Sequence, residues 1–302
     1  MTVDRGGTRM QRRELLRGAL GALLPALGHA GCSADEPAAV SAGPTAPALA
    51  TPLTTVGLQL YTVRDQIAAD PIGTLSAVAN AGYREVEFAG YFSLTPAQWK
   101  AELDRVGLTA PAAHFHLEVF QDAFAPALEN ALTLGHQFLV MPFTPHEFRS
   151  PDGYRQMAEI LNNAGQLSTP QGVQVMFHNH DFDFQPLPEA LPSEPNLGYD
   201  ILAAELDPNL VGFELDSYWI EIAGHSTIEY LQRYATSTRL MHLKDTTPGF
   251  AMEDVGYGTL DWRNIIAAAQ TAGIQHFFVE HDTTPDPLAS IQRSYDYLTT
   301  AG

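Results

Sequence analysis

The chain contains very little cysteine and lysine, and it has a deficit of positive charge. Its 302 residues include one cysteine, Cys32, and two lysines, Lys100 and Lys244, while 35 acidic residues face 16 lysines and arginines. A single cysteine cannot form a disulfide within the chain, which excludes a disulfide-stapled scaffold. The formal net charge of −19 repels nucleic acid and anionic membrane surfaces, because both bind proteins through basic patches. We therefore expect no nucleic-acid partner.

Long hydrophobic runs are also missing. The apolar stretch over residues 18–27 is too short to span a bilayer as an ordinary transmembrane helix. It follows the paired Arg12 and Arg13 and precedes a run of small residues. A basic segment, a short apolar segment and small residues are typical of a secretory signal, and the paired arginines indicate the twin-arginine (Tat) export route.

Cys32 lies at the end of this signal. The three residues before it resemble a lipobox, although His29 stands where a leucine-like residue is usual. Two alternatives remain open, lipidation of Cys32 and simple cleavage near Ala30. We predict a Tat-type, lipoprotein-like signal over residues 1–32 and a flexible Ala/Pro/Ser-rich tether over residues 33–51. The expected location is the periplasm or cell envelope, with membrane contact only through the lipid anchor.

From residue 52 onward, apolar strand-like runs alternate with helical patterns. This alternation predicts a parallel sheet, and eight such units predict one closed (β/α)8 TIM barrel over residues 52–302. No G-x-G-x-x-G sequence follows the first strand, so nothing indicates dinucleotide binding. The expected strands are 55–61, 85–88, 108–115, 138–142, 173–177, 211–215, 240–243 and 276–279.

Four of these strands deliver metal-ligand side chains near their ends. The segments are 175–180, 211–216, 240–245 and 277–282, and they contain His178, Asp216, His242 and Glu280 respectively. The carboxyl ends of barrel strands converge at one mouth, so these two histidines and two carboxylates are expected to meet. Such a ligand set predicts a site for one divalent metal ion, Mn²⁺, Mg²⁺, Co²⁺ or Zn²⁺.

The order of short motifs resembles that of the xylose-isomerase-like TIM barrels, commonly called the sugar phosphate isomerase/epimerase family. The resemblance covers about residues 55–300 and implies a metal held by residues after strands five to eight. It assigns Asp216, His242 and Glu280 as ligands. The glutamate expected after strand five is replaced by His178, which either binds the metal or leaves a site with three protein ligands. The motifs are 57–65, 82–87, 178–180, 215–216, 242–245, 256–262 and 279–282.

Further roles follow from position relative to these ligands. Glu280 is expected to act as ligand and base, with His180 as a proton carrier or substrate contact. Lys244 lies two residues after His242, on the same side of its strand, and is expected to face a substrate oxygen. Asp245 is expected to accept a hydrogen bond behind the ligands. For the substrate-binding candidates, structural packing is an equally open reading. They are Tyr61, Glu87, His114, His116 and Trp219.

The resemblance leaves several functions open. The first is a metal-dependent isomerase or epimerase of an unphosphorylated sugar or keto-sugar, acting by proton abstraction next to a carbonyl. The second is a lyase, dehydratase or hydratase acting on a keto-sugar, keto-glycoside or keto-cyclitol, and the histidine after strand five favours it. The third is a sugar-binding lipoprotein without catalysis. An apurinic endonuclease is disfavoured by the charge, the export signal and the replaced glutamate. A homo-oligomer remains possible on sequence grounds.

Overall fold

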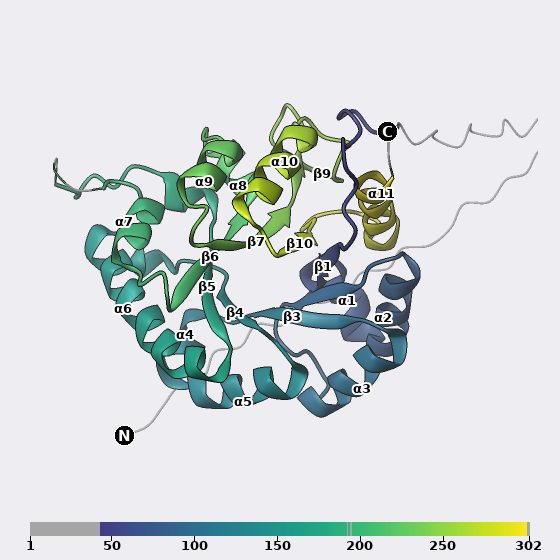
Figure 1. The fold of residues 1–302 in the computed structure, drawn as a ribbon, viewed down its shortest axis with the longest axis horizontal. Helices are drawn as coiled ribbons and strands as arrows, with labels where there is room; N and C mark the ends of the chain where they lie inside the picture. The colour runs from purple at the N-terminus through teal and green to yellow at the C-terminus, as the bar shows by residue number, and fades with distance from the viewer. Residues whose placement is uncertain (1–42, 192, 194, 301–302) are drawn as a thin grey trace, which may run out of the picture. The chain divides into compact units, whose positions relative to one another are not determined.

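Eight parallel strands close into a barrel in the computed structural model, which describes residues 43–191, 193 and 195–300 (Figure 1). The barrel closes because the first strand pairs with the last, with Gly57 opposite Phe278. The predicted TIM barrel is therefore confirmed. The barrel strands are β1 (Gly57–Gln59), β2 (Glu85–Phe88), β3 (Thr109–His114), β4 (Phe138–Met141), β5 (Gln174–His178), β6 (Val211–Asp216), β7 (Thr238–Leu243) and β10 (His276–Val279).

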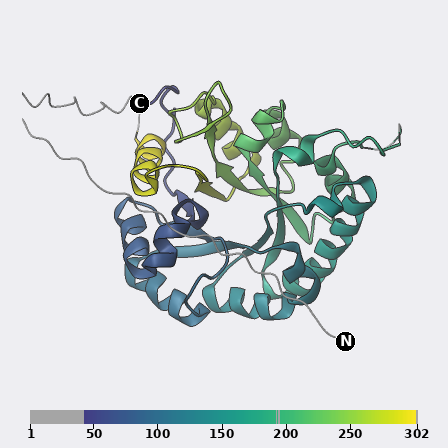
Figure 2. The same ribbon diagram turned by 180° about the vertical axis from the view of Figure 1, so that it is seen from behind.

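Helices surround the barrel on its outer side, as both ribbon views show (Figures 1 and 2). Among the described residues, no helix is long and apolar enough to cross a membrane. A small antiparallel pair, β8 (Asp245–Thr246) and β9 (Met252–Glu253), follows β7. The α-helices are α1 (Arg64–Ala69), α2 (Pro71–Asn80), α3 (Pro96–Val106), α4 (Leu117–Asp122), α5 (Phe124–Leu134), α6 (Pro151–Ser168), α7 (Gly198–Glu205), α8 (Ser217–Ile222), α9 (Thr227–Arg233), α10 (Trp262–Ala272) and α11 (Pro287–Thr299). The 3-10 turns are η1 (Leu60–Val63), η2 (His146–Phe148), η3 (Thr169–Gln171) and η4 (Asp181–Phe184).

Local sequence signals set several helix ends. Asp70 accepts a hydrogen bond from the Gly73 amide at the start of α2, and Thr95 forms a capping box with Gln98 at the start of α3. Gly107 ends α3 in the left-handed conformation, with φ of 73°, which a side chain would disfavour.

The barrel interior consists of an apolar floor below a polar layer. The floor includes Ala112, Met176, Leu240 and Phe278, all buried in one cluster. Because side chains alternate along a strand, the inward-facing residue two positions later lies one layer nearer the mouth. These later residues are polar, so the two-residue period of the strands places the candidate functional side chains directly above the apolar floor. They are His114, His178, His242 and Glu280.

The segment before β1 does not behave as the predicted tether. Leu49 is 3% exposed and packs in the main core, although residues 33–51 were expected to be flexible. The amides of Thr45 and Ala46 donate to the Gly256 carbonyl, and the Tyr297 hydroxyl donates to the Pro47 carbonyl. Both ribbon views place this stretch beside α11 (Figures 1 and 2). The tether prediction is thus wrong for residues 43–51, because their apolar side chains and backbone find partners on the barrel. The predicted signal and Cys32 lie outside the described residues.

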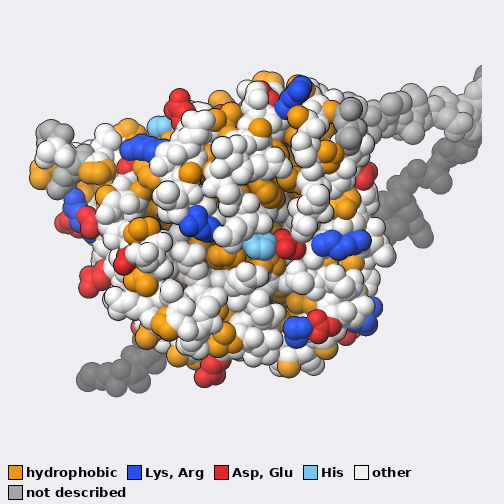
Figure 3. Space-filling model, viewed as in Figure 1, with side chains coloured by type: hydrophobic (Ala, Val, Ile, Leu, Met, Phe, Trp, Pro, Cys, Tyr) orange, Lys and Arg blue, Asp and Glu red, His pale blue; other side chains and the backbone are white. Residues whose placement is uncertain are grey.

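Positive charge is dispersed on the face drawn in Figure 3. There the Lys and Arg side chains lie apart from one another, with acidic and hydrophobic side chains between them. Such an arrangement gives this face no continuous basic patch of the kind that tracks a phosphate backbone.

Candidate metal centre

The ends of four neighbouring strands bring the predicted ligands together. Ligand atoms of Asp216, His242 and Glu280 all lie within 4.8 Å of one another. Nδ1 of His242 is 2.9 Å from Oε2 of Glu280 and 3.8 Å from Oδ2 of Asp216. Nε2 of His178 lies 3.9 Å from the same Asp216 oxygen. The four predicted ligands therefore surround one small volume at the mouth of the barrel.

The two carboxylate oxygens of Asp216 have different surroundings. Its Oδ1 accepts a hydrogen bond from the Trp219 amide and caps α8. Its Oδ2 is buried, accepts no hydrogen bond from the described residues and lies 3.3 Å from the Lys244 ammonium. The side-chain amide of Asn179, the middle residue of His-Asn-His, donates to the Asp216 carbonyl and accepts from the Asp216 amide, which holds the ends of β5 and β6 together. A buried carboxylate oxygen that accepts no hydrogen bond is stabilised by a cation, here the Lys244 ammonium. A divalent metal can take the same place, so the residues present fit such an ion.

Two carboxylates lie directly beneath the ligand histidines. Oε2 of Glu214 is 3.1 Å from Nδ1 of His178, and Oε2 of Glu87 is 2.7 Å from Nε2 of His242. In the tautomer whose proton lies on the nitrogen next to the carboxylate, the other nitrogen, Nε2 of His178 or Nδ1 of His242, faces the candidate metal position. Histidine ligands commonly have this arrangement, because the carboxylate fixes the ring and its tautomer. Gln59 donates to Glu87 and fixes that carboxylate in turn.

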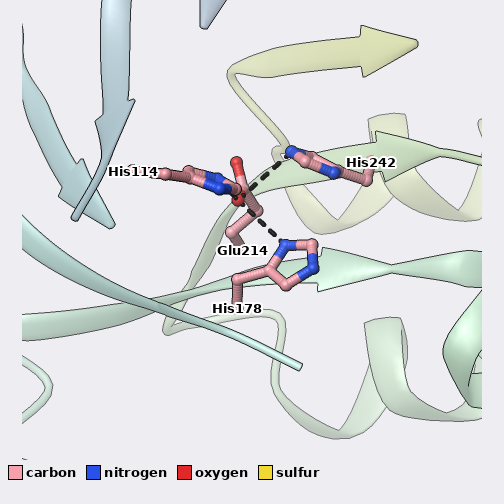
Figure 4. A group of neighbouring side chains, drawn as sticks. All are labelled: His114, His178, Glu214 and His242. Atoms are coloured by element: carbon pink, nitrogen blue, oxygen red, sulfur yellow. Dashed lines mark hydrogen bonds and ion pairs between the residues drawn. The ribbon is translucent and has the colours of Figure 1, made fainter. Parts of the chain in front are cut away.

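Figure 4 shows the rings of His114, His178 and His242 directed at the carboxylate of Glu214. These four side chains form a second group whose ligand atoms lie within 4.8 Å of one another. Burial lowers the pKa of His114, but Glu87 and Glu214 outweigh it and raise that pKa to about 9. A protonated His114 cannot ligate a metal until it loses its proton. Burial lowers the pKa of His242, but Glu214 and Glu280 raise it well above its ordinary value, so protonation does not decide between the two groups.

The remaining electrostatics are dominated by one buried lysine. The Lys244 ammonium lies 2.7 Å from Glu280, 3.0 Å from Asp282 and 3.3 Å from Asp216. Burial lowers the pKa of Lys244, but these three carboxylates raise it well above its ordinary value. Burial alone would raise the pKa of Glu280, but Lys244 and His242 hold it well below its ordinary range. Lys244 therefore neutralises the same carboxylates that a metal would use, and the two cations compete for them.

An open pocket with a volume of about 470 Å³ lies above this centre. His180 stands in its wall, where its ring stacks on Trp219 with centroids 4.8 Å apart. Burial, followed by the neighbouring His178 and Lys244, lowers the pKa of His180 well below its ordinary value, so this imidazole is neutral. Seven of the predicted site residues line the pocket. They are Tyr61, His114, His116, His178, His180, Lys244 and Glu280.

Three predicted residues have other contacts. Glu87 was expected to touch substrate, but it is fully buried below the pocket and bonded to Gln59 and His242. Trp219 is not among the lining residues, because α8 turns it behind His180, where its ring lies 5.2 Å from the Lys244 ammonium. These two side chains support the site from behind, so their predicted substrate contacts are corrected.

Asp245 is the third predicted residue that has other contacts. It was expected to accept a hydrogen bond behind the metal ligands, but it faces away from them. Its carboxylate accepts hydrogen bonds from the amides of Gly256, Gly258 and Leu260 and from the Trp262 indole. Strand alternation is the reason, because Lys244 faces the barrel interior and the next residue faces outward. Asp245 therefore fixes the loop that follows β9.

Sequence reasoning missed the roles of Glu214, Asp282 and Asp183. Glu214 precedes Asp216 by two residues on the same strand face, and this spacing was the available signal. Asp183 is buried and accepts hydrogen bonds from the His180 amide, the Thr144 hydroxyl and the Tyr154 hydroxyl. Its role depends on contacts between distant segments, which no local pattern reveals.

Comparison with known proteins now identifies the family. Residues 75–301 match the model of the xylose isomerase-like TIM barrels, and the chain belongs to this family. A sugar phosphate isomerase/epimerase from Parabacteroides distasonis shares the fold with a TM-score of 0.72 and 23% identity, covering 87% of this chain and 96% of that one. The IolI protein with a bound zinc atom shares the fold with a TM-score of 0.60 and 16% identity, covering 80% of this chain and 96% of that protein.

One curated relative is similar over a shorter stretch. An inosose dehydratase from Clostridium botulinum is 28% identical over 92 residues, which is 30% of this chain. The chain spans 28% of that relative's length in this match. Proteins to which this chain is similar thus include a sugar phosphate isomerase/epimerase and an inosose dehydratase.

The carboxylates beneath the histidines provide a first prediction. Glu214→Gln and Glu87→Gln are each expected to weaken metal binding by about 10- to 100-fold, because the histidine ring that each carboxylate contacts loses its negatively charged acceptor. Competition with a chromophoric chelator measures this affinity. The control is Glu85→Gln on the same strand as Glu87, because Glu85 pairs with His276 and touches no candidate ligand. Unchanged affinity in the first two variants would show that neither carboxylate orients a ligand.

Proposed function

We propose that this protein is a divalent-metal-dependent enzyme that removes a proton next to the carbonyl of a keto-sugar or keto-cyclitol. The observation that carries the proposal is the convergence of Asp216, His242 and Glu280 below an open pocket. Membership of a family of sugar isomerases, epimerases and dehydratases supports it. The zinc atom bound by the IolI protein, which shares the fold, supports a metal in this chain.

The side chains around the pocket suit this chemistry. A metal held by His178, Asp216, His242 and Glu280 would polarise the carbonyl and an adjacent hydroxyl. Glu280 is ionised, since its pKa is held low, and it can accept the substrate proton. The Lys244 ammonium is placed to donate a hydrogen bond to the oxygen that gains negative charge. His180 is neutral and lines the pocket, so it can accept or return a proton from the other wall.

We propose elimination as a second outcome of the same proton abstraction. Two-face epimerisation by a pair of carboxylates is not supported here, because His178 replaces the first of them and its pKa is lowered to about 3 by burial and by His242. A leaving group needs an acid, and His114 lines the pocket with its pKa raised to about 9. A lyase or dehydratase therefore has a proton donor in place, which favours this branch.

Proton exchange separates these possibilities. The metal-loaded protein is incubated in deuterated water with a panel of keto-sugars and keto-cyclitols, and the products are followed by nuclear magnetic resonance and mass spectrometry. Deuterium at the carbon next to the carbonyl, with a rearranged or inverted product, supports isomerase or epimerase activity. Deuterium with loss of water or of a glycosidic group supports a lyase. Saturable binding without exchange would contradict the catalytic proposal and indicate a sugar-binding protein.

We also propose export and anchoring for this chain. The paired arginines and Cys32 motivate this proposal, and neither lies within the described residues. Cys32→Ala is expected to move the protein from the membrane fraction to the soluble periplasmic fraction. The same distribution in both forms would remove the anchor from the proposal and leave a cleaved signal.

A further inference from the structure

The pocket above the metal centre is divided into two chemically different halves. The ends of β5, β7 and β10, with His114 from β3, give it a polar half. The segments after β2, β3 and β4 give it a largely apolar half, in which His116 is the ionisable side chain, and Tyr61 completes the lining. The polar half consists of His114, His178, His180, Lys244, Glu280 and Asp282. The apolar half consists of Ala89, Gly90, Phe115, Val119, Pro142 and Phe143.

The apolar half is preorganised, because neighbouring aromatic side chains hold its exposed ring in position. Phe143 is 39% exposed, yet its ring packs edge-on against His180 at 5.4 Å and against Phe182 at 5.1 Å. The Arg149 guanidinium lies 3.4 Å from the Phe182 ring centroid and 5.0 Å from that of Phe143. Phe143 therefore touches the proton-carrying histidine on one side and presents apolar surface to the pocket on the other.

The charges of the lining do not suit a phosphate. The lining contains no arginine, and its lysine, Lys244, already contacts three carboxylates. Two arginines near the mouth are engaged on aromatic rings, Arg149 on Phe182 and Arg64 on Tyr61 at 4.3 Å. A phosphate group on the substrate would meet hydrocarbon in one half. In the other it would meet Glu280 and Asp282 together with two cations, His114 and Lys244, that already pair with carboxylates. An apolar group has the opposite preference, because it gains free energy when it leaves water for such a wall.

We infer that the substrate is an unphosphorylated keto-sugar that carries an apolar substituent, about as large as an aromatic ring, next to its reacting sugar. The inference rests on the proposed function, which fixes the sugar carbonyl over the metal centre. The substituent then lies along Phe115, Val119 and Phe143. The pocket volume of about 470 Å³ falls within the range that proteins use for ligands larger than a single small ring.

A matched pair of ligands tests the inference. Methyl and phenyl glucopyranosides, each oxidised to the ketone at one ring carbon, are titrated into the metal-loaded protein by calorimetry. The phenyl compound is expected to bind at least about tenfold more tightly, because its ring leaves water against the apolar half. Phe143→Ala and Val119→Ser are each expected to reduce this preference to about threefold or less. Phe250→Ala is the matched control, because Phe250 is 61% exposed and does not line this pocket.

The outcomes distinguish this inference from the proposed function. Equal affinity for the two glycosides, a phenyl preference that survives Phe143→Ala and Val119→Ser, or no saturable binding of either glycoside overturns the inference. Deuterium exchange into the methyl glycoside with no phenyl preference leaves the proposed function intact and removes only the apolar substituent. A phenyl preference without any exchange keeps the ligand class and overturns the catalytic proposal.

Discussion

His242→Ala is expected to lose the bound metal and to lower the rate of proton exchange at least about a thousandfold. His242 is fully buried, and one of its nitrogens faces Asp216 and Glu280 while the other is held by Glu87. Its removal takes away a ligand and its alignment together, and the charge stabilisation that a divalent metal supplies is worth several kcal/mol. Metal content of the purified protein and exchange in deuterated water measure the two losses.

The matched control for this variant is His276→Ala. His276 is another histidine on an inner strand, and its Nδ1 is 2.8 Å from Glu85, but it lies at the opposite end of β10 from the candidate ligands. His276→Ala should therefore keep about one equivalent of metal and its exchange activity. Metal retained by His242→Ala at the wild-type level would place the metal elsewhere and contradict the proposed centre.

Lys244→Met is expected to destabilise the metal-free protein by about 3–5 kcal/mol, or roughly 10 °C in melting temperature. The variant leaves Asp216, Glu280 and Asp282 close together in a buried site without their cation. Since the pKa of Lys244 is raised above its ordinary 10.5, this stabilisation is fully present at pH 7 and is lost only at higher pH. Differential scanning calorimetry of chelator-treated protein measures the change.

Metal should reverse much of this effect. A divalent ion completes Asp216 and Glu280 without competition from the ammonium, so Lys244→Met is expected to bind metal more tightly than the wild type. The only other lysine supplies the control. Lys100 forms an exposed pair with Asp104 four residues later in α3, and such pairs contribute about 0.3–0.5 kcal/mol. If both lysine variants shift the melting temperature equally, Lys244 is not the counter-ion of the carboxylates.

The strands could be predicted from sequence because each is a short apolar run between clear helix signals. The predicted limits of β2 (Glu85–Phe88) and β10 (His276–Val279) agree with the structure. The predicted first strand, 55–61, is too long, because Leu60–Val63 form the 3-10 turn η1, whose N-cap is Gln59. α4 and α5 were not predicted, since the stretch 117–134 has no capping pattern that separates two helices.

The candidate site could be predicted only where a motif stands at a strand end. Asp216, His242 and Glu280 are such residues, and the structure brings them together. Glu214 and Asp245 show the limits. The importance of Glu214 depends on three histidines from other strands, and the role of Asp245 depends on a loop that reaches Leu260. Contacts of this kind are fixed by tertiary packing, which the local sequence does not encode.

The contacts of residues 43–53 with the barrel limit how far the barrel can lie from Cys32. The Thr45 amide donates to the Gly256 carbonyl, and the Leu53 amide donates to the Leu298 carbonyl. On the proposal that Cys32 carries a lipid, the chain between Cys32 and Thr45 has a maximum reach of about 45 Å, at ~3.6 Å per residue. The barrel would then search only a thin shell of space above the membrane. Substrates close to the membrane surface would meet the barrel at a raised effective concentration. Molecules beyond its reach from the membrane would not meet it.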